Sequence, residues 1–138
     1  MLQKIFSPLK EYSLLPIRIA LGWIFIAHGG QKLFGWWGGM GLEGFAGFLN
    51  SLGVHPAMLW AFLSAGAEFF GGLMILFGVY ARWGALLITI DMIVAVATVH
   101  WSHGFFIMNQ GYEYNVAILG MTLCILYSGS GRFSIKQD

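Results

Sequence analysis

Charged residues are scarce in this sequence. Lysine, arginine, aspartate and glutamate together make up 9% of the 138 residues, whereas hydrophobic residues make up 58%. A soluble domain contains about a quarter charged residues, because water has to solvate its surface. So few charges cannot coat a soluble domain, and we therefore expect lipid to surround the chain. At this length we expect a single domain, residues 1–138.

Two further scarcities exclude classes of function. Cys124 is the only cysteine, which rules out intrachain disulfides, CxxC redox pairs and thiolate metal clusters. The net charge is only +1, and no basic patch suited to nucleic acid is present, so we expect no nucleic-acid partner. The glycines lie in apolar stretches and form no dinucleotide fingerprint, so we expect no NAD or flavin site. If the chain does redox work, the electrons must pass through something that it binds.

Long apolar segments recur four times along the chain. A helix needs about 20 mainly apolar residues to cross the hydrocarbon core of a membrane. The four segments are residues 14–34, 56–79, 83–101 and 112–128. They predict an all-α fold, namely an integral membrane bundle of four transmembrane helices with the lipid bilayer as its surroundings. We interpret the first segment as an uncleaved signal-anchor, because its apolar run continues to Lys32 and three more segments follow.

Basic residues near the ends of these segments indicate an orientation. They concentrate at the two termini and in the short second loop, as Lys4, Lys10, Arg82, Arg132 and Lys136. The opposite side has only Lys32. Because lysine and arginine are enriched on the cytoplasmic side, both termini are predicted to be cytoplasmic.

The first outer loop has a helical pattern of its own. Its apolar residues recur at helical spacing, as Leu42, Phe45, Leu49 and Leu52. The polar residues of the loop fall off that stripe. The pattern predicts a short interfacial helix or a cap over the mouth of the bundle, with a hydrophobic loop packed on the bundle as the alternative.

Three charged residues lie within the apolar segments. Arg18 lies in the first segment, Glu68 near the middle of the second and Asp91 near the middle of the third. Each charge costs about 2.5–3.5 kcal/mol at the centre of a membrane helix, so these side chains need partners. We predict an Arg18–Glu68 pair, with Asp91 near it or neutral. This group is either a polar site for a proton-coupled or anionic ligand or a buried ion pair that only fixes helix register. Ala67 and Gly71 flank Glu68 and suggest that the second segment is the central packing helix.

A second polar group is expected toward the outer face. Its candidate ligand-binding residues are His28, Lys32, His100, His103 and Glu113. Such side chains can hydrogen-bond a quinone carbonyl, and histidines can also ligate haem or a metal. We expect no metal or haem, although His28, His100 and His103 are the residues that would ligate one. Asp91 and His100 are nine residues apart and so face opposite sides of a regular helix, which predicts two separate sites unless the helix bends.

Short motifs recur along nearly the whole chain. They are Arg18–Gly22, His28-Gly29 and Lys32–Phe34; Glu68–Gly72, Leu76–Gly78 and Arg82; and His100, Gly111, Glu113 and Gly129–Ser134. In their order and spacing these motifs resemble the DoxX family. The resemblance implies a four-helix protein of the bacterial inner membrane. It also implies an association with oxidoreductase systems, through sulfur oxidation with a quinone acceptor or through thiol and oxidative stress.

Three functions are compatible with these residues. The first, which we favour, is a quinone-interacting membrane subunit of an oxidoreductase system, and whether this chain is itself catalytic stays open. The second is a scaffold that holds a soluble redox enzyme at the membrane. The third is a small-solute transporter, for which one four-helix unit is small, so that a homodimer would be required.

Overall fold

The chain folds into a set of helices. The computed structural model describes residues 2–136, and within them every regular element is a helix or a helical turn. The α-helices of this part of the chain are α1 (Leu2–Phe6), α2 (Leu15–Phe34), α3 (Gly41–Ser51), α4 (Ala57–Phe77), α5 (Ala81–Ala95) and α6 (Glu113–Ser128). The shorter turns are η1 (Ser7–Tyr12), η2 (Trp36–Gly38), η3 (Val96–His100), η4 (Trp101–His103) and η5 (Ile107–Asn109). The predicted all-α class is confirmed.

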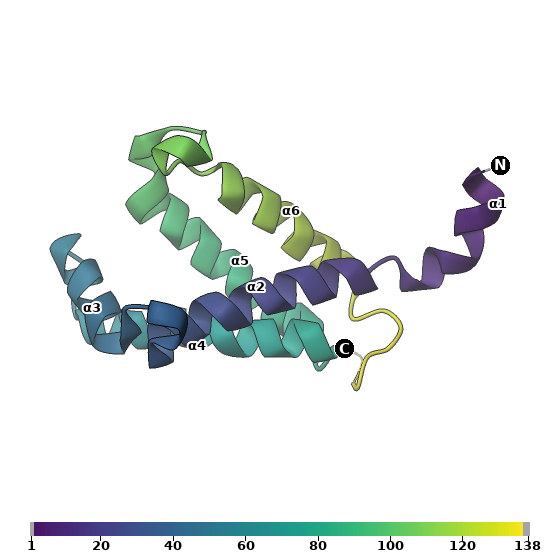
Figure 1. The fold of residues 1–138 in the computed structure, drawn as a ribbon, viewed down its shortest axis with the longest axis horizontal. Helices are drawn as coiled ribbons and strands as arrows, with labels where there is room; N and C mark the ends of the chain where they lie inside the picture. Colours follow the sequence, from purple (N-terminus) through teal and green to yellow (C-terminus); the bar gives the residue numbers. More distant parts are fainter. Residues whose placement is uncertain (1, 137–138) are drawn as a thin grey trace.

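The long helices form two hairpins (Figure 1). In the first, α2 and α4 lie side by side and run in opposite directions, with α3 at the end where they are connected. In the second, α5 and α6 lean away from α2 toward the end that carries η3, η4 and η5. Because α4 contacts α2, α3 and α5, it is the central helix of the fold.

Several helices have the length and composition of a membrane span. The helix α4, with 21 residues, is long and apolar enough, and so is Ala81–His103, in which η3 and η4 continue α5 over 23 residues. A third span results if α2 is counted together with the bent segment that precedes it. Large hydrophobic side chains such as Trp23 and Trp83 face outward. Long apolar helices with large hydrophobic side chains on their outer surface are typical of a membrane protein.

Glycines bring α4 close to both of its neighbours. A Cβ atom on Gly72 would lie 2.7 Å from the backbone nitrogen of Ile26 in α2. A Cβ atom on Gly71 would lie 3.1 Å from the carbonyl oxygen of Gly84 in α5. Backbones can approach this closely only where a side chain is absent. The prediction that the second apolar segment packs centrally is confirmed.

We expect Gly72→Ala to destabilise the protein by about 1–3 kcal/mol, because the added methyl group has to push α2 away. Gly66→Ala in the same helix is the matched control, since a Cβ atom there meets nothing within 4 Å. Alanine at that position should be neutral or should stabilise α4 by up to about 1 kcal/mol. Thermal unfolding in detergent, followed by tryptophan fluorescence, measures both. Equal melting temperatures for the two variants would contradict the close contact.

The helix predicted in the first outer loop is present as α3. Its Phe45 and Ala46 are buried, and they pack on Ala61 and Ala65 of α4. The apolar stripe thus faces the bundle, and α3 covers the ends of α2 and α4 where they are connected (Figure 1). The turn η2, with its pair of tryptophans, leads into α3 from α2.

Arg18 fastens the C-terminal segment to the bundle. Its side chain is almost fully buried, with 1% exposed. Its guanidinium donates hydrogen bonds of 2.8–3.2 Å to the backbone carbonyls of Ile75, Leu76, Ser130, Arg132 and Phe133. The last carbonyls of a helix lack partners within that helix, and the planar fork of arginine supplies five donors to such groups.

The predicted pair of Arg18 with Glu68 is therefore wrong. Ile75, whose carbonyl accepts from Arg18, lies seven residues beyond Glu68 in α4. At a rise of 1.5 Å per residue the two positions are about 10 Å apart along the helix. The guanidinium is thus placed at the end of α4, where the last carbonyls of the helix accept its hydrogen bonds, and Glu68 lies closer to the other end of α2.

We expect Arg18→Gln to release residues 129–136 and to destabilise the protein by at least about 3 kcal/mol, because several buried carbonyls lose their donors. Trypsin cleavage after Arg132, identified by mass spectrometry, should become faster. Lys10→Gln also replaces a cationic side chain by glutamine, but at an exposed residue of η1, and is the control. Cleavage at wild-type rates in Arg18→Gln would show that other contacts hold this segment.

Candidate functional site

A buried ion pair joins α2 to the middle of α4. The Nζ atom of Lys32, in the last turn of α2, lies 2.8 Å from Oε1 of Glu68. The Glu68 side chain is 3% exposed, and that of Lys32 is 25% exposed. The ammonium group also lies 4.6 Å from the centre of the Phe45 ring, so that α3 covers the pair on one side. Lys32, predicted to belong to the outer polar group, is in fact the partner of the deep carboxylate.

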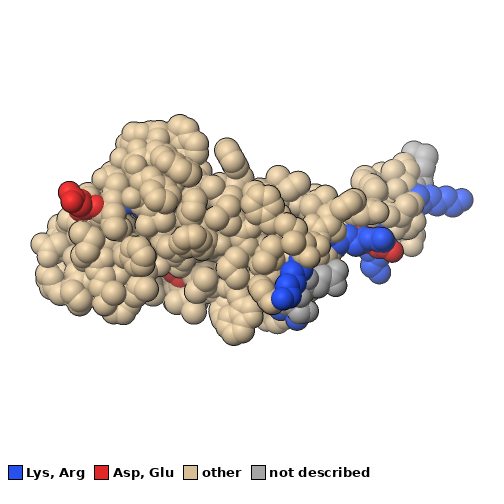
Figure 2. Space-filling model, turned by 90° about the horizontal axis from the view of Figure 1, so that it is seen from below, with Lys and Arg blue, Asp and Glu red and all other residues tan. Residues whose placement is uncertain are grey.

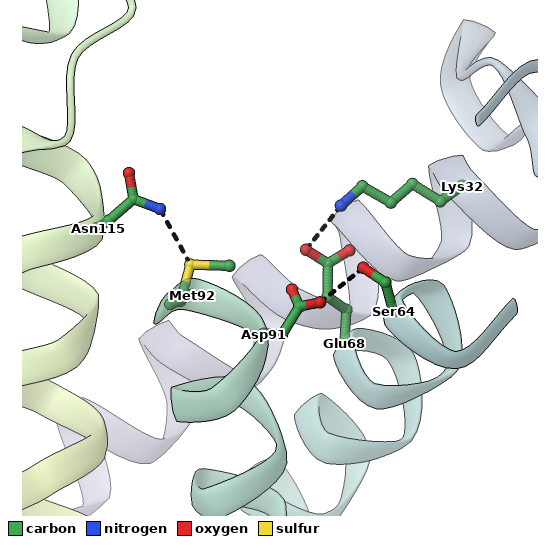
Figure 3. A network of polar contacts seen from close by, with 6 residues as sticks. All are labelled: Lys32, Ser64, Glu68, Asp91, Met92 and Asn115. Carbon is green, nitrogen blue, oxygen red and sulfur yellow. Dashed lines mark hydrogen bonds and ion pairs between the residues drawn. The ribbon is translucent and has the colours of Figure 1, made fainter. Parts of the chain in front are cut away.

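A second carboxylate faces Glu68 from α5. Figure 3 shows the side chains of Glu68 and Asp91 directed toward one another, with Ser64 beside them. The hydroxyl of Ser64 donates a hydrogen bond of 2.6 Å to Oδ1 of Asp91. Within residues 2–136, Oε2 of Glu68 is the buried side-chain oxygen or nitrogen without a hydrogen-bond partner. The cluster therefore holds two carboxyl groups, one ammonium group and one acceptor that a ligand could satisfy.

Polar side chains of α6 extend this cluster toward the second hairpin. Asn115 is buried and donates from its amide to the sulfur of Met92, at 3.4 Å (Figure 3). The ring of Tyr114 lies 6.5 Å from that of His28 in α2. Of these residues, the sequence analysis identified only His28. Ser64 could have been found, because it lies one turn before Glu68 in the same apolar segment.

The other outer residues stabilise the connection between α5 and α6. Nδ1 of His100 is 2.7 Å from the carbonyl oxygen of Gln110, and Nδ1 of His103 is 2.8 Å from that of Val99. Since a carbonyl only accepts, each Nδ1 carries the hydrogen. Oε2 of Glu113 accepts a hydrogen bond of 2.9 Å from the backbone of Ile107. These side chains close a loop, and their contacts do not include Lys32 or Glu68.

The predicted outer group is thus divided. His28 and Lys32 lie on α2 beside the carboxyl cluster, whereas His100, His103 and Glu113 lie in or next to the loop after α5. The π turn η3 interrupts the regular helix between Asp91 and His100, but the two residues bind different partners. In the part of the chain that the structure describes, no three histidine, cysteine, aspartate or glutamate side chains lie together as a metal site.

An apolar groove lies between α5 and α6. It has a volume of about 400 Å³, opens to the outside of the bundle and is lined by Ile93, Val96, Ala97, Trp101 and Leu119. On α5 it begins one residue after Met92, and on α6 it lies one turn after Asn115. Along α5 and α6 the groove thus starts close to the contact between Met92 and Asn115, and its walls are apolar.

The sequence profile of the DoxX family matches residues 13–101, which are most of the chain and contain α2, α3, α4 and α5. The chain belongs to the DoxX family. Lys32, Ser64, Glu68 and Asp91 all lie in the matched part. The resemblance on which the sequence analysis relied is thereby confirmed.

Two individual relatives are similar over most of their length. An uncharacterized protein of Haemophilus influenzae is 28% identical over 125 residues, which cover 89% of this chain and 80% of that protein. A putative oxidoreductase, CatD, of Bacillus subtilis is 29% identical over 115 residues, which cover 83% of this chain and 79% of that protein. No solved structure matches the chain. Family and relatives together indicate a membrane-associated protein with an oxidoreductase-related role.

We expect Lys32→Met to destabilise the protein by about 3–5 kcal/mol, because it leaves the Glu68 carboxylate buried without a cation. The double variant Lys32→Met/Glu68→Gln should recover much of that loss. Thermal unfolding of the single and double variants gives the coupling energy, and Lys10→Met is the exposed control. A double variant as unstable as the sum of the two single ones would argue against the pair.

Proposed function

We propose that this protein is the membrane subunit of an oxidoreductase system and that it binds a quinone at the Lys32–Glu68–Asp91 cluster. Membership of the DoxX family and the similarity to a relative named as a putative oxidoreductase support the redox role. The observation that carries the quinone proposal is the unpartnered, buried Oε2 of Glu68 beside an ammonium donor.

The cluster suits both redox states of a quinone. The Lys32 ammonium has three N–H donors, and one of them is used on Glu68, so another can donate to a quinone carbonyl. Oε2 of Glu68 can accept a hydrogen bond from a quinol hydroxyl. A carboxylate in that position is also placed to take up the proton that the hydroxyl loses when the quinol is oxidised.

The surroundings of the cluster suit the rest of such a ligand. A quinone has a flat polar head and an isoprenoid tail, and the groove between α5 and α6 offers apolar walls that open toward lipid. His28 and Tyr114 provide rings at the side of the cluster. Interconversion of quinone and quinol requires two electrons. Because the chain has a single cysteine, we assign the other half-reaction to a partner, namely a soluble redox enzyme of thiol or oxidative stress defence or of sulfur oxidation.

The same proposal includes four membrane spans. The helix α6 has 16 residues and measures about 24 Å, which is less than the hydrocarbon core of about 30 Å. Local thinning of the bilayer accommodates a short span of this kind. Lysine and arginine gather at one end of the molecule in Figure 2. We place that end, with both termini, on the cytoplasmic side of the bacterial inner membrane.

Glu68→Gln and Asp91→Asn should each weaken binding of the reduced (quinol) form of the ligand at least about tenfold, because the carboxylate acceptors for its hydroxyl groups are lost. Binding of ubiquinone and menaquinone analogues to protein in lipid nanodiscs can be measured by tryptophan quenching and by native mass spectrometry. Glu43→Gln, at an exposed carboxylate in the first turn of α3, is the control and should bind like the wild type. Wild-type protein that binds neither analogue would refute the proposal.

A further inference from the structure

The segment before α2 carries an apolar stripe that the bundle does not cover. Leu2, Ile5, Phe6 and Leu9 follow one another at positions i, i+3, i+4 and i+7, which places them on one side of a helix. Their exposed fractions are 68%, 55%, 58% and 51%, respectively. Neither α1 nor η1 contains a buried residue. These apolar side chains therefore need a covering from outside the chain.

The direction of the segment separates it from the first membrane span. Leu2–Tyr12 is bent by 52° relative to α2, and in Figure 1 it extends away from the other helices. The helix α2 alone has 20 residues and measures about 30 Å, which matches the thickness of the hydrocarbon core. By length, α2 reaches across the core without the segment, which lies at the N-terminal end of α2.

The charges of this end indicate what covers the stripe. Lys4 and Lys10 lie off the stripe in the same segment. Figure 2 shows further lysine and arginine side chains at this end of the molecule. An apolar stripe beside basic side chains is the pattern of a helix that lies in the headgroup layer of an anionic membrane surface. Either an acidic soluble protein or an anionic membrane surface would complement these charges. We choose the membrane surface, because lipid lies beside this segment in every copy of a membrane protein.

The C-terminal segment holds the N-terminal one in place. The rings of Tyr12 and Phe133 are stacked, with centres 5.4 Å apart. Arg132 forms an ion pair with Glu11 and lies over the ring of Tyr12. Since Arg18 binds the carbonyls of Arg132 and Phe133, these contacts connect the N-terminal segment to the interior of the bundle.

We infer that residues 2–12 form an interfacial anchor, with Leu2, Ile5, Phe6 and Leu9 buried at the boundary of headgroups and acyl chains. Lys4 and Lys10 then contact anionic phospholipid headgroups. The anchor sets the depth at which α2 enters the membrane and fixes the position of the C-terminal segment through Tyr12 and Glu11. It does not depend on the quinone proposal.

The test places an environment-sensitive fluorophore in the full-length protein, with Cys124→Ser as background. Ile5→Cys and Leu9→Cys carry the probe on the stripe, and Ser7→Cys carries it off the stripe. The proteins are reconstituted in vesicles of phosphatidylcholine, with or without phosphatidylglycerol. In the anionic vesicles, probes at positions 5 and 9 should emit at shorter wavelength than the probe at position 7. They should also be quenched by brominated acyl chains and be protected from iodide.

The charge contribution is tested with Lys4→Gln/Lys10→Gln, combined with the probe at position 5. Its blue shift should decrease in the anionic vesicles and become equal to that in phosphatidylcholine alone. Equal iodide quenching at positions 5, 7 and 9 in both kinds of vesicle would overturn the anchor. Protection that appears only after addition of a soluble protein would overturn it as well and would assign the stripe to a protein partner.

Discussion

The close contact of α4 with both of its neighbours is the constraint on which the rest of the structure depends. Gly29 of α2 packs on the backbone of Phe69, next to Glu68, and Lys32 follows Gly29 by one turn. On the other side, Gly71 meets Gly84 of α5. Ser64 lies seven residues before Gly71 and Asp91 lies seven residues after Gly84, so two turns along antiparallel helices bring them together. The glycine contacts therefore set the register of the carboxyl cluster.

Two cations near opposite ends of α2 stabilise different parts of the bundle. Arg18 and Lys32 are fourteen residues apart, about 21 Å along the helix. Arg18 supplies donors to carbonyls at the end of α4 and in the C-terminal segment. Lys32 neutralises a carboxylate. Arg18 thus stabilises the fold and, through Arg132 and Phe133, holds the N-terminal segment. Lys32 belongs to the candidate site.

The cluster lies where the two hairpins begin to diverge. Glu68 and Asp91 belong to the tightly packed pair α4–α5, while Asn115 of α6 contacts Met92 (Figure 3). Tyr114 of the same helix lies beside His28. Next to them the groove opens between α5 and α6. The same divergence leaves His100, His103 and Glu113 at the loop, where they bind backbone groups.

Much of this protein was determined by the sequence alone. Low charge and apolar segments predicted the helical membrane fold, helical spacing predicted α3, and small residues identified α4 as the central helix. Which cation meets Glu68 was not predictable, because Arg18 and Lys32 lie on the same helix and only the offset between α2 and α4 decides between them. The separation of Lys32 from His100 and His103 has the same origin. Spacing along one helix determines which residues share a face, whereas the depth at which two helices meet is set by their packing.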